Sequence, residues 1–455
     1  MYITCMAGGA MKKILFFMIF LVFISPSYGK EDKPEETMSF ALTGDSIITM
    51  KISVFDEPAY TDMINIIRSS DVAITNFEGL FHNYEGYPSA QSGGTYVTGE
   101  PELAGELTWA GFDMLCRANN HALDYGYEGV KATDEALKKE GLVFGGVGEN
   151  LALARSPVYM DTKKGRVALI SCTSTFPRSS AAGNQRADMK GRPGVNPLRY
   201  STRYIVDNQT FMNLYKMVFD LKLSHNITEQ SLSFLNLQFE KGDKCQIITE
   251  PDRNDLEEIK KSIKEARNQA DWVVFSLHSH EGMSDNYAMP AAFVQTVARE
   301  AIDSGAHIFF SHGAHLLKGI EIYKKKPIFY GLGNFIFQID TIKYLPDDLY
   351  ERYNLPSDSP VSDIFNTDRY NNCNKPENWE TVIALPVFDG KKQLKEIRLY
   401  PVSLGFKEGR TKRGRPVPAS EELSRSMLER LKSLSSSFGT EIFYENNFFV
   451  VKIAE

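Results

Sequence analysis

The stretch DWVVFSLHSH, Asp271 to His280, is an apolar run that ends in two histidines. A short apolar run bounded by polar residues is typical of a buried strand. One helical pattern precedes it (DLEEIKKSIKEARNQA, 255–270), and another follows it (AAFVQTVAREAIDSG, 291–305). The next run, AHIFFSHGAH (306–315), is again apolar and again ends in histidines. Strands that alternate with helices in this way indicate a layered α/β domain.

The N-terminal half shows the same alternation, with helical patterns from about Tyr60 and over 127–141. Its strand-like runs are MSFALTG (38–44), DVAITN (71–76), FDMLCRAN (112–119) and VALISCTST (167–175). Farther along, KPIFYGLGNFIF (326–337) is predicted to form one more strand.

Two stretches rich in Tyr, Asn, Asp and Ser interrupt the pattern, at about 196–251 and about 340–379. We interpret them as insertions that decorate the rim of a main domain spanning 38–405, over or near a site. A helical pattern and a strand-like run at 406–455 predict a small C-terminal extension. Cys245 and Cys373 lie in the insertions, where an oxidising compartment would allow them to pair; the sequence leaves this open.

Composition limits the kinds of ligand. The chain has 455 residues, 42% of them hydrophobic and 24% charged, which is typical of a globular protein. Its formal net charge of −7 argues against a nucleic-acid partner, which would require a basic face. An acidic protein also repels polyanions, so a polyanionic ligand would need local neutralisation, which metal cations supply.

Residues 1–29 have the features of an export signal preceded by an upstream start. Met11-Lys12-Lys13 is a basic region, Ile14–Ser25 is an apolar run, and Ser27-Tyr28-Gly29 offers small residues for cleavage. We therefore expect an exported protein in the periplasm or another extracytoplasmic space. The alternative is an uncleaved segment that holds the protein at the membrane, although twelve apolar residues are few for a span.

Polar residues begin where the apolar runs end. They are Asp45; Asn76 and Glu78; Asn119, Asn120 and His121; His278 and His280; His312 and His315; and Asn334 in the turn YGLGNF. Because the carboxyl ends of strands in open α/β sheets meet at one edge, we expect these side chains to converge. Five of the eight histidines lie at such ends.

Imidazole, carboxylate and amide oxygen together form a ligand set for Mn, Fe, Zn or similar divalent ions. One or two such ions would clamp a displacement reaction and lower the pKa of a bound water. In this interpretation Asn120 is a ligand and His121 donates a proton to the leaving group. Asp124 would orient the His121 ring and raise its basicity.

Asn76, Asn119, Asn334 and Arg178 are candidates for binding the substrate, but these residues and Asp124 also have ordinary structural explanations. Asn76 could cap locally, Asn119 could form a turn, and Asp124 could cap the helix predicted near Tyr127. Asn334 could shape a tight glycine turn rather than contact a ligand. Arg178, in a loop with two further arginines, could bind an anionic substrate, although a solvated basic loop is the commoner explanation.

Six motifs in order resemble the CapA family of capsule-synthesis proteins, which is linked to poly-γ-glutamate and is similar in turn to calcineurin-like metallophosphoesterases. The motifs are GD (44–45), NFEG (76–79), ANNHALDYG (118–126), SLHSHE (276–281), HGAHLLKGIE (312–321) and IFYGLGNFIFQ (328–338). The resemblance implies a four-layer α/β/β/α sandwich of the metallo-dependent phosphatase type, with the site at one edge of two sheets.

The resemblance also assigns residues. Asp45, Glu78, Asn120, His278, His312 and His315 match metal-binding positions, and His121 matches the histidine of the Asn-His pair. This chain departs from the phosphoesterases in three ways. Asp45-Ser46-Ile47 lacks their second ligand, the bridging acid is Glu78 instead of Asp, and the closing histidines are three residues apart. His280 is a candidate for the missing ligand.

Two functions follow from the resemblance. The first is a metal-dependent hydrolase that acts on a phosphoester or an amide of an anionic envelope polymer or its precursor. The second is a non-catalytic assembly or export factor that grips polymer carboxylates through bound cations. Members of the family often work with membrane-bound polymer synthase components, so such a component is an expected partner.

Overall fold

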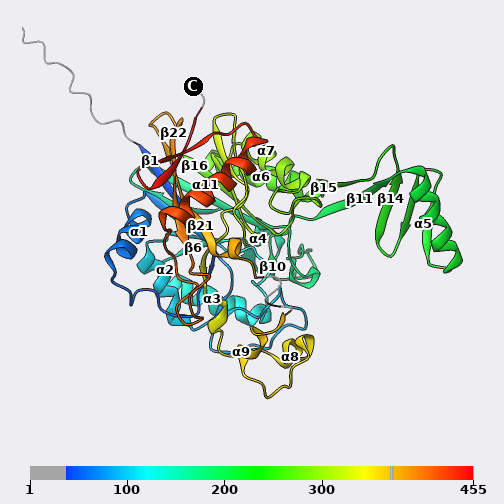
Figure 1. Ribbon diagram of the computed structural model, residues 1–455, viewed down its shortest axis with the longest axis horizontal. Coiled ribbons are helices and arrows are strands. Elements are labelled where there is room, and N and C mark those ends of the chain that lie inside the picture. Colours follow the sequence, from blue (N-terminus) through cyan, green and yellow to red (C-terminus); the bar gives the residue numbers. More distant parts are fainter. Residues whose placement is uncertain (1–36, 369, 371–373, 454–455) are drawn as a thin grey trace, which may run out of the picture. The chain divides into compact units, whose positions relative to one another are not determined.

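Two large β-sheets lie face to face in the computed structural model, which describes residues 37–368, 370 and 374–453 (Figure 1). The ten-stranded sheet has the order β24 (Ile442–Glu445), β25 (Phe448–Val451), β22 (Leu394–Ser403), β21 (Glu380–Phe388), β1 (Met38–Ile47), β2 (Val72–Phe77), β5 (Met114–Cys116) and β6 (Val143–Gly145), with β20 (Asn334–Phe337) beside β1 and β23 (Val417–Pro418) beside β22. The six-stranded sheet has the order β18 (Ile320–Tyr323), β19 (Lys326–Phe329), β17 (Ile308–Gly313), β16 (Trp272–Ser279), β9 (Gly165–Thr173) and β8 (Val158–Thr162).

Alternating side chains explain why both faces of each sheet are covered. In β1, Phe40 and Leu42 point into the core between the sheets, while Ala41 points to the opposite face. In β16, Trp272 and Val274 enter the core between the sheets and Phe275 faces away from it. Because successive side chains of a strand alternate between its faces, continuous apolar runs are buried on both sides.

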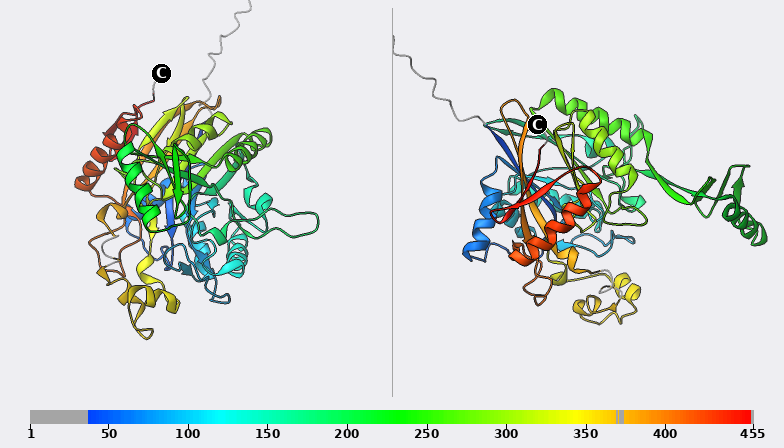
Figure 2. Two further views of the ribbon diagram at one scale, coloured as in Figure 1. Left: turned by 90° about the vertical axis from the view of Figure 1, so that its right-hand side faces the viewer. Right: turned by 45° about the horizontal axis from the view of Figure 1, so that its top comes forward.

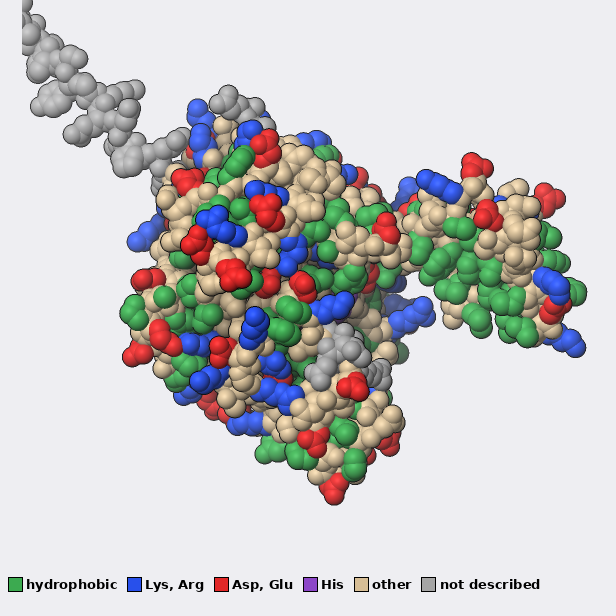
Figure 3. Space-filling model, in the orientation of Figure 1, with side chains coloured by type: hydrophobic (Ala, Val, Ile, Leu, Met, Phe, Trp, Pro, Cys, Tyr) green, Lys and Arg blue, Asp and Glu red, His purple; other side chains and the backbone are tan. Residues whose placement is uncertain are grey.

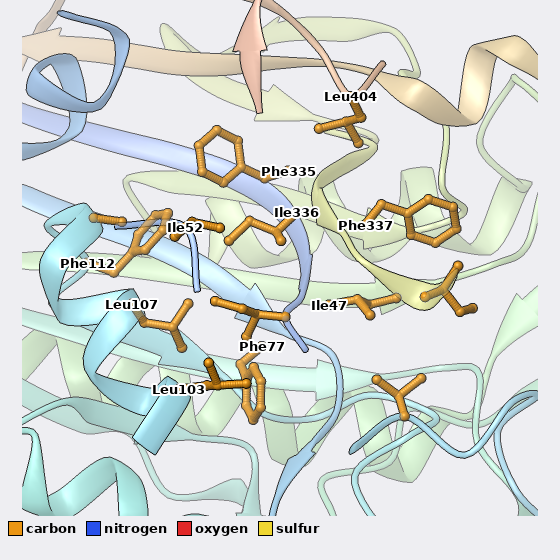
Figure 4. Packing of buried hydrophobic residues seen from close by; sticks show 14 of the residues in the cluster. Ile47, Ile52, Phe77, Leu103, Leu107, Phe112, Phe335, Ile336, Phe337 and Leu404 are labelled. Carbon is orange, nitrogen blue, oxygen red and sulfur yellow. The ribbon is translucent and has the colours of Figure 1, made fainter. Parts of the chain in front are cut away.

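Helices cover the outward faces of both sheets (Figure 2). On the ten-stranded sheet they are α1 (Pro58–Arg68), α2 (Ala104–Ala110) and α3 (Gly126–Lys139); on the six-stranded sheet they are α6 (Arg253–Gln269) and α7 (Ala292–Asp303). Figure 4 shows part of the apolar cluster between the ten-stranded sheet and its helices, in which Leu103 and Leu107 lie near Phe77 of β2. The prediction of a mixed α/β fold is confirmed.

The prediction of a single strand over 326–337 is wrong, because this stretch forms two strands. β19 belongs to the six-stranded sheet and β20 to the ten-stranded sheet. The chain crosses between the sheets at a glycine-containing turn, which approaches β1 so closely that a Cβ on Gly44 would lie 1.8 Å from the carbonyl oxygen of Gly333. The apolar pattern predicted extended structure, but it carried no sign of the change of sheet.

The first insertion forms an arm that extends away from the two large sheets (Figures 1 and 2). It contains a five-stranded sheet and one helix: β12 (His225–Ile227), β13 (Ser231–Phe234), β14 (Leu237–Lys241), β11 (Tyr200–Val206), β15 (Gln246–Pro251) and α5 (Asn208–Asp220). Its apolar core is small, and Figure 3 shows hydrophobic side chains on its surface. Phe219, Leu221 and Leu235 are among the exposed ones.

The second insertion stays close to the large sheets and contains α8 (Asp347–Tyr353) and α9 (Val361–Ile364). At the C-terminal end, α11 (Glu421–Ser436) packs on the core between the sheets, and β25 pairs with β22, so the last hairpin extends the ten-stranded sheet. The other short elements are β3 (Leu80–Phe81), β4 (Thr98–Gly99), β7 (Val147–Gly148), β10 (Gly194–Val195) and α4 (Leu151–Arg155).

The predicted export signal and Cys373 lie outside the described residues. Cys245 is exposed on the arm and is a free thiol. Within the described ranges, every helix is too short or too polar to cross a bilayer.

Candidate metal centre

Four strands end and β20 begins at one edge of the two sheets, and the polar residues there come together. In the ten-stranded sheet, Asp45 of β1 pairs in register with Asn76 of β2 and with Asn334 of β20. In the six-stranded sheet, His278 of β16 pairs with His312 of β17. The two sets meet across the interface, where Nδ2 of Asn76 is 3.4 Å from Nδ1 of His278. The predicted convergence of these strand ends is therefore what the structure shows.

The inner group consists of Asp45, His278 and His312, all of them buried. One nitrogen or oxygen atom of each lies within 4.8 Å of those of the other two. Nδ1 of His312 is 3.2 Å from Oδ1 of Asp45 and 3.1 Å from Nδ1 of His278. The hydroxyl of Ser276 lies 2.8 Å from the other ring nitrogen of His312, and this contact orients Nδ1 toward the group.

Asp45 is held by hydrogen bonds on both carboxylate oxygens. Nδ2 of Asn76 donates to Oδ1, and the backbone N–H of Gly313 donates to Oδ2, each at 2.8 Å. Gly313 has a φ of +98°, and a Cβ there would lie 2.8 Å from the His278 ring, so only glycine allows this approach. Burial alone would raise the pKa of Asp45, but the hydrogen bond with His312 and the neighbouring imidazoles lower it overall. This carboxyl group is therefore ionised.

The outer group consists of Glu78, His280 and His315. One nitrogen or oxygen atom of each lies within 4.8 Å of those of the other two. Glu78 is fully buried, and within the described part of the chain neither carboxylate oxygen has a hydrogen-bond partner. Burial, and then the nearby Asp45 carboxylate, raise the pKa of Glu78 well above its usual value. The neutral form of Glu78 is therefore favoured, and a cation bound beside it would instead stabilise the ionised form.

His278 connects the two groups. Its Nε2 atom is 3.7 Å from Oε1 of Glu78 and 3.1 Å from Nε2 of His280. Burial lowers the pKa of the His278 and His315 imidazoles, and burial together with the nearby His315 lowers that of His280 to about 3. These rings are therefore neutral, which is the form that binds metals.

The donor set fits divalent cations. Two carboxylates and four imidazoles converge. Within the described residues, neither oxygen of one carboxylate has a hydrogen-bond partner, and the amide oxygen Oδ1 of Asn120 is also buried without one. A divalent cation would satisfy these atoms and offset the two buried negative charges. The residues thus have the composition of a site that could hold a metal ion.

His315 has a strained backbone, with a φ of +55°. Non-glycine residues adopt this left-handed region infrequently, and such strain tends to occur at functional sites. Nδ1 of His315 lies 2.7 Å from Oδ1 of Asn334, and Nδ2 of Asn378 donates to the His315 carbonyl at 2.9 Å. Asn334 in turn donates to the carbonyl of Asn378 at 2.8 Å, so both asparagines hold His315 in place.

His121 and Asp124 form a buried pair beside the two groups, with Nδ1 of His121 2.7 Å from Oδ2 of Asp124. Backbone N–H groups of Gly93 and Val97 also donate to the Asp124 carboxylate, at 3.0 and 3.2 Å. Because a carboxylate only accepts, His121 carries its proton on Nδ1 and leaves Nε2 available. Asp124 does not cap α3, whose N-cap residue, Tyr125, makes no side-chain cap bond.

A cavity of about 290 Å³ opens over these residues. The site contributes Asn120, His121, His280 and His315 to its lining. The second insertion also contributes, and the described lining contains Arg352 but no Asp or Glu. Nη1 of Arg352 donates to the carbonyl of Gly94 at 2.9 Å, which ties α8 to the opposite wall.

The four residues predicted to bind the substrate do not line the cavity. Asn76 contacts Asp45, and Asn119 donates to the Asn76 side chain at 3.2 Å and to the carbonyl of Phe77 at 2.8 Å. Together with Asn334 they support the ligand-type residues, and none of the three is among the described residues that line the cavity. Arg178 is exposed and is likewise absent from that lining.

Sequence reasoning missed a supporting network behind His280. Lys318 is 2% exposed, donates to the carbonyl of Glu281 at 2.9 Å, and has a pKa lowered to about 8 by burial. The Glu281 carboxylate accepts hydrogen bonds from Ser174, Thr175 and Ser279, at 2.7 to 2.9 Å. Lys318 and Glu281 both lie in the quoted motifs, but their pairing depends on the packing of β16 against the turn after β17.

Comparison with known proteins shows which family the chain belongs to. The family described as bacterial capsule synthesis protein PGA_cap matches residues 39–339, which include every residue of both groups. An uncharacterized protein of Sinorhizobium fredii, y4sH, is 33% identical over 428 residues, covering 90% of this chain and 92% of that protein.

Two relatives have functional names. The capsule biosynthesis protein CapA of Bacillus anthracis is 25% identical over 312 residues, covering 67% of this chain and 61% of CapA. The PGA biosynthesis protein CapA of Bacillus subtilis is 26% identical over 322 residues, covering 68% of this chain and 67% of that protein. The family resemblance predicted from the six motifs is confirmed, and the chain belongs to the bacterial capsule synthesis protein PGA_cap family.

Proposed function

We propose that this protein is a metal-dependent hydrolase of capsule or envelope polymer biosynthesis, acting on an anionic polymer such as poly-γ-glutamate or on its precursor. The observation that carries the proposal is Glu78, a buried carboxylate with both oxygens unsatisfied, next to neutral imidazoles and beneath an open cavity. The order of ligand-type residues along the chain resembles that of calcineurin-like metallophosphoesterases. The paired sheets with outer helices are consistent with that fold.

In this proposal Asp45, Glu78, Asn120, His278, His280, His312 and His315 hold one or two divalent ions. Such ions act as Lewis acids and lower the pKa of water. His121, on the cavity wall, would take up a proton at Nε2 and pass it to the leaving group, while Asp124 accepts from Nδ1–H and keeps the ring in place. Arg352 and the absence of carboxylates in the described lining favour an anionic substrate.

The alternative is a non-catalytic assembly or export factor that binds polymer carboxylates through the same cations. The names of the two CapA relatives, which refer to biosynthesis and not to hydrolysis, favour it. Both versions place the protein outside the cytoplasm, exported through residues 1–29 or held at the membrane by them. Both also allow a membrane-bound synthase component as partner and no nucleic acid, and both assign the site to the domain spanning 38–405.

The test uses protein that begins at Thr37, because all of the apolar cores lie within the compact unit from Thr37 onward. Elemental analysis measures bound metal, and the same sample is assayed for hydrolysis of an aryl phosphodiester and of poly-γ-glutamate. Metal with turnover supports the hydrolase. Metal with polymer binding but no turnover supports the assembly factor, and a protein that takes up no divalent metal contradicts both.

A further inference from the structure

A second hollow, of about 470 Å³, lies at the opposite end of the sandwich from the metal centre. Its lining is Lys324, Lys325, Lys326, Lys392, Gln393, Leu394, Lys395 and Ile453. The lysines come from two hairpins, β18–β19 and β21–β22, and lie in their turns or at the start of the following strand. Five lysines and no acidic residue line it within the described chain, although the whole protein has a formal net charge of −7.

Aromatic rings lie beneath these lysines. Nζ of Lys326 is 5.7 Å from the centre of the Phe388 ring, and Nζ of Lys392 is 5.6 Å from that of Trp272. Burial lowers the pKa of Lys326, and the neighbouring cations Arg267 and Lys392 lower it further. The cations are therefore crowded closely enough to disfavour one another's charge, and an anion bound in the hollow would relieve this repulsion.

The aspartates around the hollow offset only part of its charge. Lys324 pairs with Asp303 at 2.6 Å and Lys392 with Asp271 at 3.2 Å, while Lys395 is 3.9 Å from Asp389. These ion pairs are partly exposed and therefore weak, so the lysines can exchange partners at little cost. Lys325 and Lys326 have no ion-pair partner within the described ranges.

The position of the hollow relative to the N-terminal apolar run indicates which kind of anion it binds. Met38, near the start of the described chain, pairs with Phe388 at the floor of the hollow, and Figure 1 shows the turn after β21 beside the start of β1. β1 then leads away to Asp45, about 23 Å farther on at the usual rise of a strand. In the sequence, the apolar run Ile14–Ser25 precedes Met38 by only twelve residues, which span at most about 40 Å. If residues 1–29 are retained as a membrane segment, the hollow lies at the end of the sandwich to which that segment is joined.

We propose that the lysine hollow binds the headgroups of acidic phospholipids, so that the sandwich stands on an anionic membrane surface with its metal centre facing away. The headgroup phosphates pair with Lys325 and Lys326 and displace the aspartates from the other lysines. The short tether favours a lipid surface over a free polyanion, because it keeps this end of the sandwich near the bilayer whenever the apolar run is inserted. The inference is independent of whether the metal centre is catalytic.

The test uses the chain from Thr37, which lacks the apolar run, and measures its co-sedimentation with vesicles of phosphatidylcholine alone or mixed with phosphatidylglycerol. A triple variant, Lys324→Gln, Lys325→Gln and Lys326→Gln, removes three charges from the hollow. The matched control, Lys131→Gln, Lys138→Gln and Lys139→Gln on α3, removes the same charge from another face. Circular dichroism and bound metal must equal those of the parent, so that a loss of binding is not a loss of fold.

We expect the parent and the α3 control to bind the phosphatidylglycerol vesicles but not phosphatidylcholine alone, with binding that weakens as salt is raised. The hollow variant should bind about a hundredfold more weakly, since each lysine near such a surface contributes roughly fivefold. Equal binding by parent and hollow variant would overturn the proposal. So would a hollow that binds soluble poly-γ-glutamate but not vesicles, because the anion would then be a polymer.

Discussion

Asp45 and Glu78 are both fully buried carboxylates at the ends of neighbouring strands, yet they differ in their hydrogen bonds. Asp45, in the inner group, accepts hydrogen bonds on both oxygens, and its pKa is lowered. Glu78, in the outer group, accepts none within the described chain, and its pKa is raised. The inner group is organised by the protein itself, whereas the outer group depends on a ligand. The fold therefore organises one half of the site, and we propose that a cation completes the other.

Replacement of Asp45 should have the largest effect, because it removes the centre of the inner group. We expect Asp45→Ala to lose bound metal and all turnover, and to lose about 3–5 kcal/mol of unfolding free energy as buried partners are left unpaired. Elemental analysis and urea denaturation of parent and variant measure both effects. If Asp45→Ala keeps its metal, the inner group is not the anchor of the site.

His121→Ala separates catalysis from binding. His121 contacts Asp124 and lines the cavity, so its loss should lower turnover about 10²- to 10⁴-fold while bound metal stays at the parent level. His225→Ala, at an exposed histidine on the arm, is the matched control and should change neither quantity. Unchanged turnover in His121→Ala would exclude it as the acid and favour the assembly factor.

Glu78→Gln tests, through the pH dependence of stability, whether Glu78 is the carboxyl group that the fold leaves without partners. Because the pKa of Glu78 is raised on folding, the unfolded chain releases this proton first, and the stability of metal-free protein falls as pH rises above the usual value of 4.5. The variant lacks this group, so its stability should decline less over the same range. Urea denaturation of chelated proteins across a pH series measures the difference, and identical slopes would show that Glu78 ionises without penalty.

Removal of the arm should have the smallest effect on the site. Arg203 of β11 pairs in register with Ile248 of β15, so a short glycine-serine turn between them can replace 204–247. The shortened chain should keep bound metal and turnover, because no described cavity-lining residue comes from the arm. A loss of metal or turnover would show that the arm supports the site.

The sequence predicted the site better than its surroundings. Strand ends bearing Asp45, His278 and His312 were readable because apolar runs terminate in polar residues, and the sheet brings such ends together. The two insertions share a composition, yet one leaves the domain and the other lines the cavity. Composition does not show whether an insertion extends away from the domain or packs against it, so the positions of the two insertions could not be predicted.

Other features depended on contacts between distant segments. The change of sheet between β19 and β20 follows from the space available beside Gly44, which no local pattern encodes. Asn76, Asn119 and Asn334 were expected to contact substrate, but the structure places them against ligand-type residues. The lysine hollow combines two hairpins about seventy residues apart, and each alone resembles an ordinary basic turn.

Anomalous X-ray diffraction at the absorption edge of the metal found by elemental analysis tests the central claim most directly. Crystals of the chain from Thr37 should show one or two peaks within bonding distance of Asp45 and His312 in the inner group, and of Glu78 where a second ion is present. Peaks at other positions, or none after soaking in Mn, Fe or Zn salts, would contradict the account.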